Sequence, residues 1–415
     1  MRKVLDQMSG NTAALPSDLR RSNRMQVLEV FKWGGEFTIN QIAAQVGLSR
    51  QTVMKAVQFF VEQGIVAAVG KGGSTAAGGK RPDLFSLANH KRLLAIDLWP
   101  SRLNCTLLDF KGQVVDRLVR EQPLPDDLER TAASVGGFAR DLLARSNVLP
   151  DALCGVCISV SGTVDYRSGT LRYSSHTPGW GTDVPLARLL RPYLGAYTPV
   201  LLENTGKLSA RSLLQSRELL TKRVLCLFTA WGLSGCFIER GRILNGKDSL
   251  IGEFGHMILD PDDEERCGCG SHGCFERLVS NDRIRRRAAA LRAAYPGTCL
   301  GAPEALTVQA VFAASEAGDP CARRLADELA MRFATALRNI TLVFDPDEVV
   351  FQGDFAAADA YFLQRFWEYL KEFQYYPNGE PFQLHLDRRP LDELSWQGAY
   401  TLLMDHYFSN LRIFV

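Results

Sequence analysis

Three thiols and a histidine are grouped in the middle of the chain in a pattern that suits a metal ion. Cys267, Cys269 and Cys274 fall within eight residues, and His256 lies eleven residues before the first of them. Structural zinc sites take three or four Cys and His ligands on tight turns, and the glycines between these cysteines let a loop fold back on an ion. His272, inside the loop, is an alternative ligand, and a thiol loop without metal is the other interpretation. We expect one structural zinc ion per chain.

Two acidic residues flank the thiol loop. Glu253 stands one helical turn before His256, and Glu276 stands two residues after Cys274. A metal that pins the loop would also hold these two carboxylates near one another. Each of them could instead be a solvated carboxylate at the surface.

The bulk composition limits the class of protein. A chain of 415 residues is too long for one core, so two or three domains are expected. A hydrophobic share of 46% and a charged share of 23% are ordinary for a globular protein. We find no apolar run of about 18 residues and no apolar signal core, and we therefore expect a cytoplasmic protein without a membrane span. The remaining cysteines suit reduced thiols, most of them in the core.

Positive charge is concentrated at the start of the chain. Residues 1–90 hold 11 Lys and Arg against 6 Asp and Glu, a net charge of +5, whereas the remaining residues carry a net charge of −3. A small basic unit on a slightly acidic body is typical of a nucleic-acid module joined to another domain.

Apolar periodicity predicts three helices in this basic unit, over residues 24–33, over residues 39–46 and from Ser49 onward. Gly47 suits the turn between the last two, and Ser49 suits the N-cap of the third. This is the helix-turn-helix pattern, whose second helix enters the major groove. A helical unit for protein interaction or dimerisation is the alternative. We expect DNA contacts from Ser49, Arg50, Gln51, Thr52 and Lys55.

Two strands after the third helix predict a wing. Residues 65–69 and 85–87 are strand-like, and a glycine-rich loop lies between them. Cationic side chains on a wing suit phosphates or the minor groove. The candidates are Lys71, Lys80 and Arg81.

The body of the chain predicts two similar α/β lobes with a cleft between them, where pockets are commonly found. Each lobe begins with a three-strand meander, and the expected strands are 93–97, 103–109, 114–119, 152–160, 200–204, 224–229, 235–239, 242–244 and 348–351. The expected helices are 128–146, 207–220, 283–294, 308–316 and 321–343. We predict a DNA-binding domain over 1–90, an N-terminal lobe over 91–206 completed by the C-terminal helix 394–410, and a C-terminal lobe with the zinc loop over 207–393.

Two motifs in this order resemble the ROK family (repressors, open reading frames and sugar kinases). They are Gly252-Glu253-Phe-Gly255-His256 and Cys267-Gly-Cys269-Gly270-Ser-His-Gly273-Cys274-Phe-Glu276. Two further segments also resemble family signatures, Ser161-Gly162-Thr-Val164-Asp165 and Pro178-Gly179-Trp180. The resemblance covers about residues 20–405. It implies an α/β fold with two ribonuclease-H-like lobes, the actin-like ATPase or sugar-kinase fold, preceded by a winged helix-turn-helix domain.

The resemblance also implies a ligand set. Zinc would be held by His256, Cys267, Cys269 and Cys274, with His272 as the alternative to His256. A sugar effector would bind among Gly162, Asn204, Thr205, Glu253, His256 and Glu276. Sugar hydroxyls both donate and accept, so carboxylates and an amide suit them. His256 could ligate zinc through one ring nitrogen and donate to a hydroxyl through the other.

The chain departs from the family's kinases at the catalytic base. Those kinases carry Glu-Asn-Asp, and here the motif reads Glu203-Asn204-Thr205. A threonine hydroxyl is no base near neutral pH, and losing a positioned base costs about 10²–10⁴ in rate.

The three phosphate-binding motifs depart from the kinase pattern as well. Asp97-Leu98-Trp99-Pro100-Ser101 stands where kinases have Asp-x-Gly-Gly-Thr, so Trp99 adds bulk and Pro100 removes an amide donor. The second motif, Gly-Thr-Gly in kinases, resembles Trp231-Gly232-Leu233-Ser234-Gly235 with its first glycine replaced, and Gln352-Gly353-Asp354 stands where kinases have a Gly-Gly pair.

We therefore expect a sugar-responsive transcriptional repressor whose kinase-like domain has no catalytic residues. Its partners would be operator DNA, a sugar or sugar derivative, and further copies of the chain in a dimer or tetramer. Ligand binding would shift the population between lobe arrangements. The alternatives are an active sugar kinase with an added DNA-binding domain, and a repressor controlled by a phosphotransferase-type protein.

Overall fold

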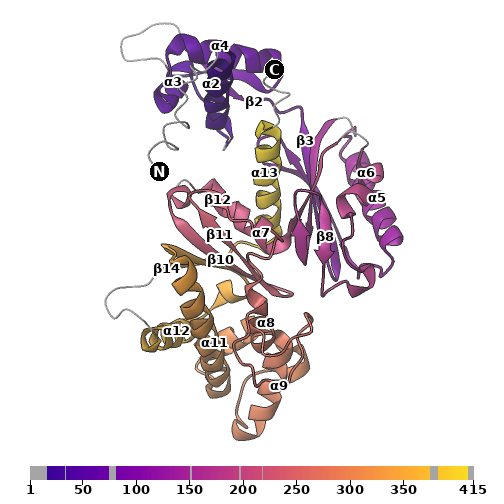
Figure 1. The fold of residues 1–415 in the computed structure, drawn as a ribbon, viewed down its shortest axis with the longest axis vertical. Helices are drawn as coiled ribbons and strands as arrows, with labels where there is room; N and C mark the ends of the chain where they lie inside the picture. The colour runs from indigo at the N-terminus through magenta and orange to yellow at the C-terminus, as the bar shows by residue number, and fades with distance from the viewer. Residues whose placement is uncertain are drawn as a thin grey trace, which may run out of the picture.

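A winged helix-turn-helix unit is followed by two α/β lobes (Figure 1). The computed structural model describes residues 16–32, 34–73, 81–149, 152–195, 198–216, 218–373 and 382–409. Within those ranges, none of the helices combines the length and apolarity that a bilayer crossing requires.

The first unit contains three helices and a two-stranded wing. They are α2 (Pro16–Phe31), α3 (Ile39–Val46), α4 (Arg50–Glu62), β1 (Val66–Lys71) and β2 (Asp83–Leu87), and the two strands are antiparallel. Thr38 and Gln41 form a capping box at the start of α3, and Gly47 ends that helix in the left-handed conformation with φ 68°. The Ser49 side chain accepts from the backbone of Thr52 and caps α4. The tight turn and the second cap set the angle between the two helices.

The first turns of α2 precede the predicted helix, which began at residue 24. The segment holds Asp18, Arg20 and Arg21 and has no apolar face for periodicity to detect. Trp33 and Lys80, on which two sequence predictions fall, lie outside the described residues.

The N-terminal lobe is a five-stranded mixed sheet in the order β5-β4-β3-β6-β9. Its strands are β3 (Arg92–Trp99), β4 (Arg102–Asp109), β5 (Val114–Glu121), β6 (Leu153–Val160) and β9 (Val200–Asn204). The first three form an antiparallel meander, and β6 and β9 run parallel to β3. Helices α5 (Leu128–Arg145) and α6 (Leu186–Leu194) cover one face, and a small hairpin, β7 (Thr163–Asp165) with β8 (Thr170–Tyr173), extends from the end of β6.

The C-terminal lobe repeats this strand arrangement in the order β12-β11-β10-β13-β14. Its strands are β10 (Arg223–Thr229), β11 (Leu233–Glu239), β12 (Arg242–Ile243), β13 (Glu348–Gly353) and β14 (Gln383–Asp387). Helices α10 (Val308–Glu316), α11 (Pro320–Phe344) and α12 (Ala360–Glu372) build its main core with one face of the sheet. The thiol loop with Cys267, Cys269 and Cys274 lies between η5 (Phe254–His256) and α8 (Phe275–Leu278), and α9 (Asn281–Leu291) follows. The repeated strand order confirms the predicted ribonuclease-H-like lobes.

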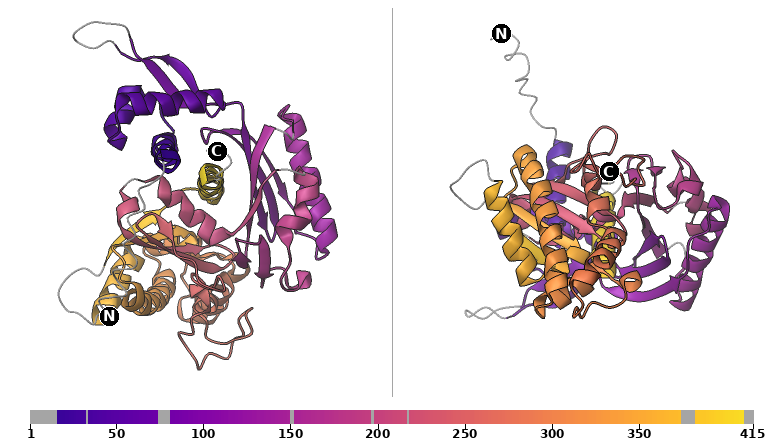
Figure 2. Two further views of the ribbon diagram at one scale, coloured as in Figure 1. Left: turned by 45° about the horizontal axis from the view of Figure 1, so that its top comes forward. Right: turned by 90° about the horizontal axis from the view of Figure 1, so that it is seen from below.

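Helix α13 (Leu391–Ser409) lies between the other parts of the molecule (Figure 2, left). It packs on β3 and β6 of the N-terminal sheet and on α7 (Thr205–Arg211). One hydrophobic core joins its residues Tyr400 and Met404 with Phe31 of α2 and Phe110 at the edge of the N-terminal lobe. The winged unit is therefore packed onto the body through α13 as well as joined to it along the chain.

The helix predicted over residues 207–220 is wrong in both bounds. Helix α7 begins at Thr205, because the Asn204 side chain caps it, and ends at Arg211. The chain continues as 3₁₀ turns over Ser212–Gln215 and Leu219–Thr221. Buried leucines keep a helical spacing across the change, so the sequence alone does not separate the two helix types. The sequence analysis also missed β7, β8, α6, α12 and β14.

Candidate functional site

The two lobes meet at a small cavity of about 60 Å³. Side chains from both lobes line it. Among the lining residues are all six candidates for sugar binding, Gly162, Asn204, Thr205, Glu253, His256 and Glu276.

Two of the N-terminal candidates are largely engaged by their own chain. The amide of Asn204 donates to the carbonyl of Gly162 at 2.7 Å and accepts from the backbone N–H of Lys207 at 3.1 Å. A side-chain amide can make further bonds at each end, so one donor and one acceptor position remain. Thr205 is 4% exposed, and its hydroxyl bonds to that of Ser159 at 3.0 Å.

Both carboxylates from the C-terminal lobe keep one oxygen available. Glu253 accepts from the hydroxyl of Thr163 at 3.1 Å, a bond that crosses from one lobe to the other. Glu276 accepts from the backbone N–H of Leu233 at 2.7 Å. Neither residue is a free surface acid, and a hydroxylated ligand could bond to the second oxygen of each.

His256, Cys267, Cys269 and Cys274 form the cluster expected to bind a metal. Their ligand atoms all lie within 4.8 Å of one another. Sγ of Cys267 is 3.6 Å from Nδ1 of His256, and the sulfurs of Cys269 and Cys274 are 3.7 Å apart. Tetrahedral zinc would separate two sulfurs by roughly 3.8 Å, and a sulfur from an imidazole nitrogen by roughly 3.6 Å. The donor set therefore suits zinc in its chemistry, and these two pairs have the spacing of zinc ligands.

Burial, together with the neighbouring thiols of Cys269 and Cys267, raises the pKa of the Cys274 thiol to about 12. Thiolates in this setting need a cation to compensate their charge. His272 is not in the cluster, because its ring Nδ1 lies 3.2 Å from the carbonyl of Glu264.

The candidate metal ligands share their short helical turns with the candidate sugar ligands. Glu253 and His256 bound the single turn η5, and Cys274 directly precedes α8, which carries Glu276. At Gly273, before this second turn, φ is 62° and a Cβ would lie 1.7 Å from the carbonyl oxygen of Asp260. Only glycine fits this close approach. A metal at the cluster would fix the two turns, and hence the two carboxylates, relative to each other.

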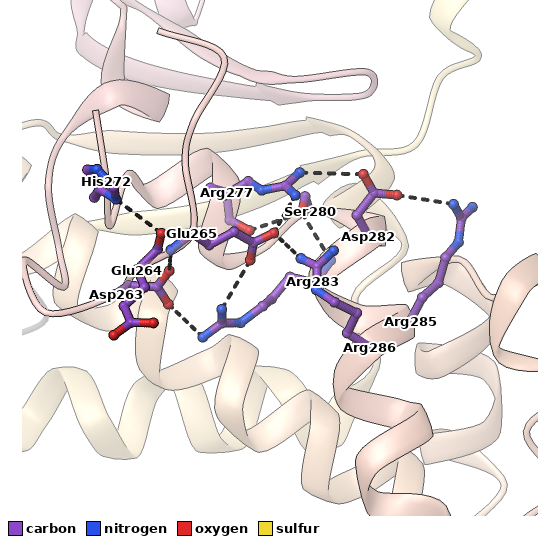
Figure 3. Close-up of polar contacts among 10 residues, drawn as sticks. All are labelled: Asp263, Glu264, Glu265, His272, Arg277, Ser280, Asp282, Arg283, Arg285 and Arg286. Atoms are coloured by element: carbon purple, nitrogen blue, oxygen red, sulfur yellow. Dashed lines mark hydrogen bonds and ion pairs between the residues drawn. The ribbon is translucent and has the colours of Figure 1, made fainter. Parts of the chain in front are cut away.

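The outer part of the thiol loop is held by arginines from α8 and α9 (Figure 3). Glu265 pairs with Arg277 and Arg286 and lies 3.1 Å from Arg283. Arg283 also pairs with Asp263 at 2.7 Å. These contacts anchor the loop immediately before Cys267.

His176 is a site residue that the sequence analysis missed. It lines the small cavity together with a larger neighbouring one, and Glu276 and His256 act electrostatically on its ring. Burial lowers the pKa of His176, so a neutral imidazole is favoured. The only signal in the sequence was its position two residues before the Pro178-Gly179-Trp180 segment.

Two tryptophans meet at the turns where phosphate motifs were expected. The ring centroids of Trp99, the last residue of β3, and Trp231, from the β10–β11 turn, are 4.5 Å apart. Trp99 is 1% exposed and Trp231 is 37% exposed. The first acid of the same motif, Asp97, accepts from Asn104 at 2.8 Å and from Ser395 of α13. Burial raises the pKa of Asp97 to about 6.

The candidate DNA contacts lie on the winged unit. Ser49, Arg50, Gln51 and Lys55 are exposed at and after the start of α4, and Thr52 is half-buried beneath them. On the wing, Arg81 is exposed, whereas Lys71 forms an ion pair with Asp83 on the paired strand. The positive charge of Lys71 is thus partly neutralised within the protein.

Comparisons with known proteins agree with this two-part organisation. The sequence profile of the ROK family matches residues 93–406, and a winged helix-turn-helix DNA-binding profile matches residues 20–67. The chain is 23% identical over 396 residues to the DNA-binding transcriptional dual regulator NagC of Escherichia coli K12, which covers 93% of each protein.

Enzymes are also similar to this chain. It is 25% identical over 274 residues to a glucokinase of Thermotoga maritima, which covers 64% of this chain and 83% of that enzyme. In fold, it resembles the crystal structure of a ROK family transcriptional regulator, a homologue of the E. coli MLC protein. The TM-score is 0.76 at 19% identity, over 95% of this chain and 99% of the other.

We expect the purified chain to carry about one zinc ion and Cys269→Ser to lose it, because three ligands hold zinc far less well than four in a structural site. Zinc per chain is measured by atomic absorption after dialysis. Cys299→Ser is the matched control, since Cys299 is also an exposed thiol but lies outside the cluster. Full retention of zinc by Cys269→Ser would contradict the ligand assignment.

Proposed function

The chain belongs to the ROK family, and we propose that it is a sugar-responsive transcriptional regulator, acting as a repressor in the cytoplasm, with a sugar-binding body that does not transfer phosphate. The observation that carries this proposal is the hydrophobic core in which α2 of the winged unit and α13 of the body pack together. A ligand that changes the relative position of the two lobes can alter the orientation of the DNA-binding helices through this core.

The winged unit suits operator DNA. Arg50 and Gln51 project from the N-terminal turn of α4, and an arginine or glutamine at that position can bond to base edges in the major groove. Arg81 on the wing would add a phosphate contact. Lys71 is a weaker candidate because of its ion pair with Asp83. Palindromic half-sites would require at least a dimer, and we propose a dimer or tetramer.

The body suits sugar binding without catalysis. Thr205 takes the position of the kinase base, and its buried hydroxyl is bonded to Ser159. Trp99 and Trp231 fill two turns that in the family's kinases carry glycines for phosphate binding. The similarity to a glucokinase favours the alternative, an active sugar kinase with an added DNA-binding domain.

A structural zinc would brace the sugar site. His256, Cys267, Cys269 and Cys274 would hold it, and the ion would supply a cross-link between η5 and α8. His256 faces the cluster through Nδ1, which leaves its second ring nitrogen to bond to a sugar hydroxyl in the cavity that the residue lines.

A chain of polar contacts connects the sugar site to the winged unit. Glu203 accepts from the backbone N–H of Asn204 at 3.1 Å and from Arg211 at 3.4 Å. Arg211 lies 4.0 Å from Asp405 on α13, whose other oxygen is 2.5 Å from Nζ of Lys32, just after α2. Removing one partner of a mostly buried ion pair leaves an uncompensated charge, so these contacts favour one relative position of α7, α13 and α2. We propose that effector binding at Asn204 alters this position.

We expect one sugar in a panel to raise the thermal midpoint of the full chain, because a ligand that binds only the folded state stabilises it. The same sugar is expected to lower operator affinity in a gel shift with a duplex selected by the wild-type chain. No turnover above background is expected in a coupled assay with ATP. Turnover would establish the kinase alternative. A panel without any shift would favour control by a protein partner, such as a phosphotransferase-type protein.

We expect Arg50→Ala to weaken operator binding by about 5–150-fold, the effect of losing one good base contact. The sugar-induced thermal shift should remain, because Arg50 is remote from the cavity. Arg188→Ala, which removes an exposed arginine from α6, is the control and should leave both measurements unchanged. Equal operator affinity for Arg50→Ala and wild type would rule out this use of α4.

We expect Asp405→Asn to reduce the factor by which the panel sugar changes operator affinity, by about threefold or more, since residues that couple two sites contribute about 0.5–2 kcal/mol. The measurement is the operator Kd with and without saturating sugar. Asp345→Asn is the control, because this carboxylate pairs with Arg223 at 3.2 Å but its side chain is 81% exposed. An unchanged factor in Asp405→Asn would disprove the polar connection.

A further inference from the structure

The sugar cavity adjoins a second, larger cavity. Its volume is about 560 Å³, against about 60 Å³ for the cavity lined by the six sugar-binding candidates. Small-molecule sites commonly have volumes of about 300–1,000 Å³. The smaller cavity is below this range, whereas the two together lie within it. They share the lining residues Ser175, His176, Trp231, Gly232, Leu233 and Glu276.

The charges of the larger cavity do not suit a nucleoside triphosphate. Its lining holds two guanidinium groups and three carboxylates. Both arginines, Arg277 and Arg285, are within 3.4 Å of the same carboxylate, that of Asp282. No surplus of positive charge is available for several phosphates. Paired charges of both signs instead offer donors and acceptors that match neutral hydroxyl groups.

Trp231 is an aromatic residue in the lining that the two cavities share. Its ring packs against that of Trp99, and 37% of the residue is exposed. An indole held by a buried neighbour is a preorganised apolar plate. The C–H face of a pyranose ring is the part of a sugar that such a plate can cover.

We propose that the effector is an oligosaccharide, with one ring in the smaller cavity and the next ring in the larger cavity against Trp231. This rests on the proposed function, since it extends the same sugar site. Glu253, His256 and Glu276 bind the first ring. His176 lies where the two cavities join, and Arg285 and Asp282 bond to hydroxyls of the second ring.

His176 lines both cavities, and an imidazole has two ring nitrogens that can form hydrogen bonds. Such a ring can bond to a hydroxyl on either side of a glycosidic linkage.

Isothermal titration of the full chain with matched pairs of sugars tests the proposal. The probes are glucose with maltose and cellobiose, N-acetylglucosamine with N,N′-diacetylchitobiose, and xylose with xylobiose. In at least one pair the disaccharide should bind about tenfold more tightly, the effect of covering roughly 60 Å² of apolar surface. Trp231→Ala should remove this advantage, and Trp231→Phe should retain most of it.

Phe373→Ala is the matched control, because Phe373 is an equally exposed aromatic residue, 36% against 37%, at the end of α12. It should keep the full advantage of the disaccharide. Monosaccharides that bind as tightly as their disaccharides would overturn the extended site and leave the sugar-sensing function intact. Competition of a non-hydrolysable ATP analogue with the disaccharide would also overturn it. Failure of every saccharide to bind would overturn the proposed function itself.

Discussion

Two short helical turns carry the acids of the candidate sugar site, and neither turn is long enough to be stable alone. Turn η5 has three residues and α8 has four, whereas an isolated helix needs about 12–15 residues. The ligand atoms of His256 and the three cysteines lie within 4.8 Å of one another, so the two turns are close together where Glu253 and Glu276 line the small cavity. Arginines of α8 and α9 hold the other side of the loop through Glu265. The site thus depends on side-chain cross-links more than on regular secondary structure.

Helix α13 connects the two lobes with the winged unit. It comes last among the described elements, yet it lies against the N-terminal sheet, α7 and the winged unit. Ser395, near its start, bonds to Asp97 of β3, and Asp405, near its end, pairs with Lys32. A rigid helix of this kind carries a displacement at one end to the other, because its backbone bonds resist bending.

Local signals in the sequence identified the features that depend on neighbouring residues. Thr38, Gly47 and Ser49 mark the helix-turn-helix by capping chemistry, and the spacing of Cys267, Cys269 and Cys274 marks the candidate metal cluster. Features that depend on distant partners were not predictable in this way. Trp99 meets Trp231 only after both lobes have folded, and Lys71 is paired by a residue across the wing. His176 lies in a loop without periodicity, so only the cavity identifies it.

The seam between α2 and α13 also bears on how such proteins can be recombined. A winged unit that was joined to the body only by a flexible linker could be exchanged for another without changing the packing of either part. In this chain, Phe31 of the winged unit is buried in the same core as Phe110 and Met404 of the body. A chimera with the winged unit of another protein would expose this apolar surface or pack poorly against it, and its free energy of unfolding would fall by several kcal/mol. A change of DNA specificity in this architecture should therefore come from substitution of the exposed residues of α4, or from exchange of the winged unit together with α13.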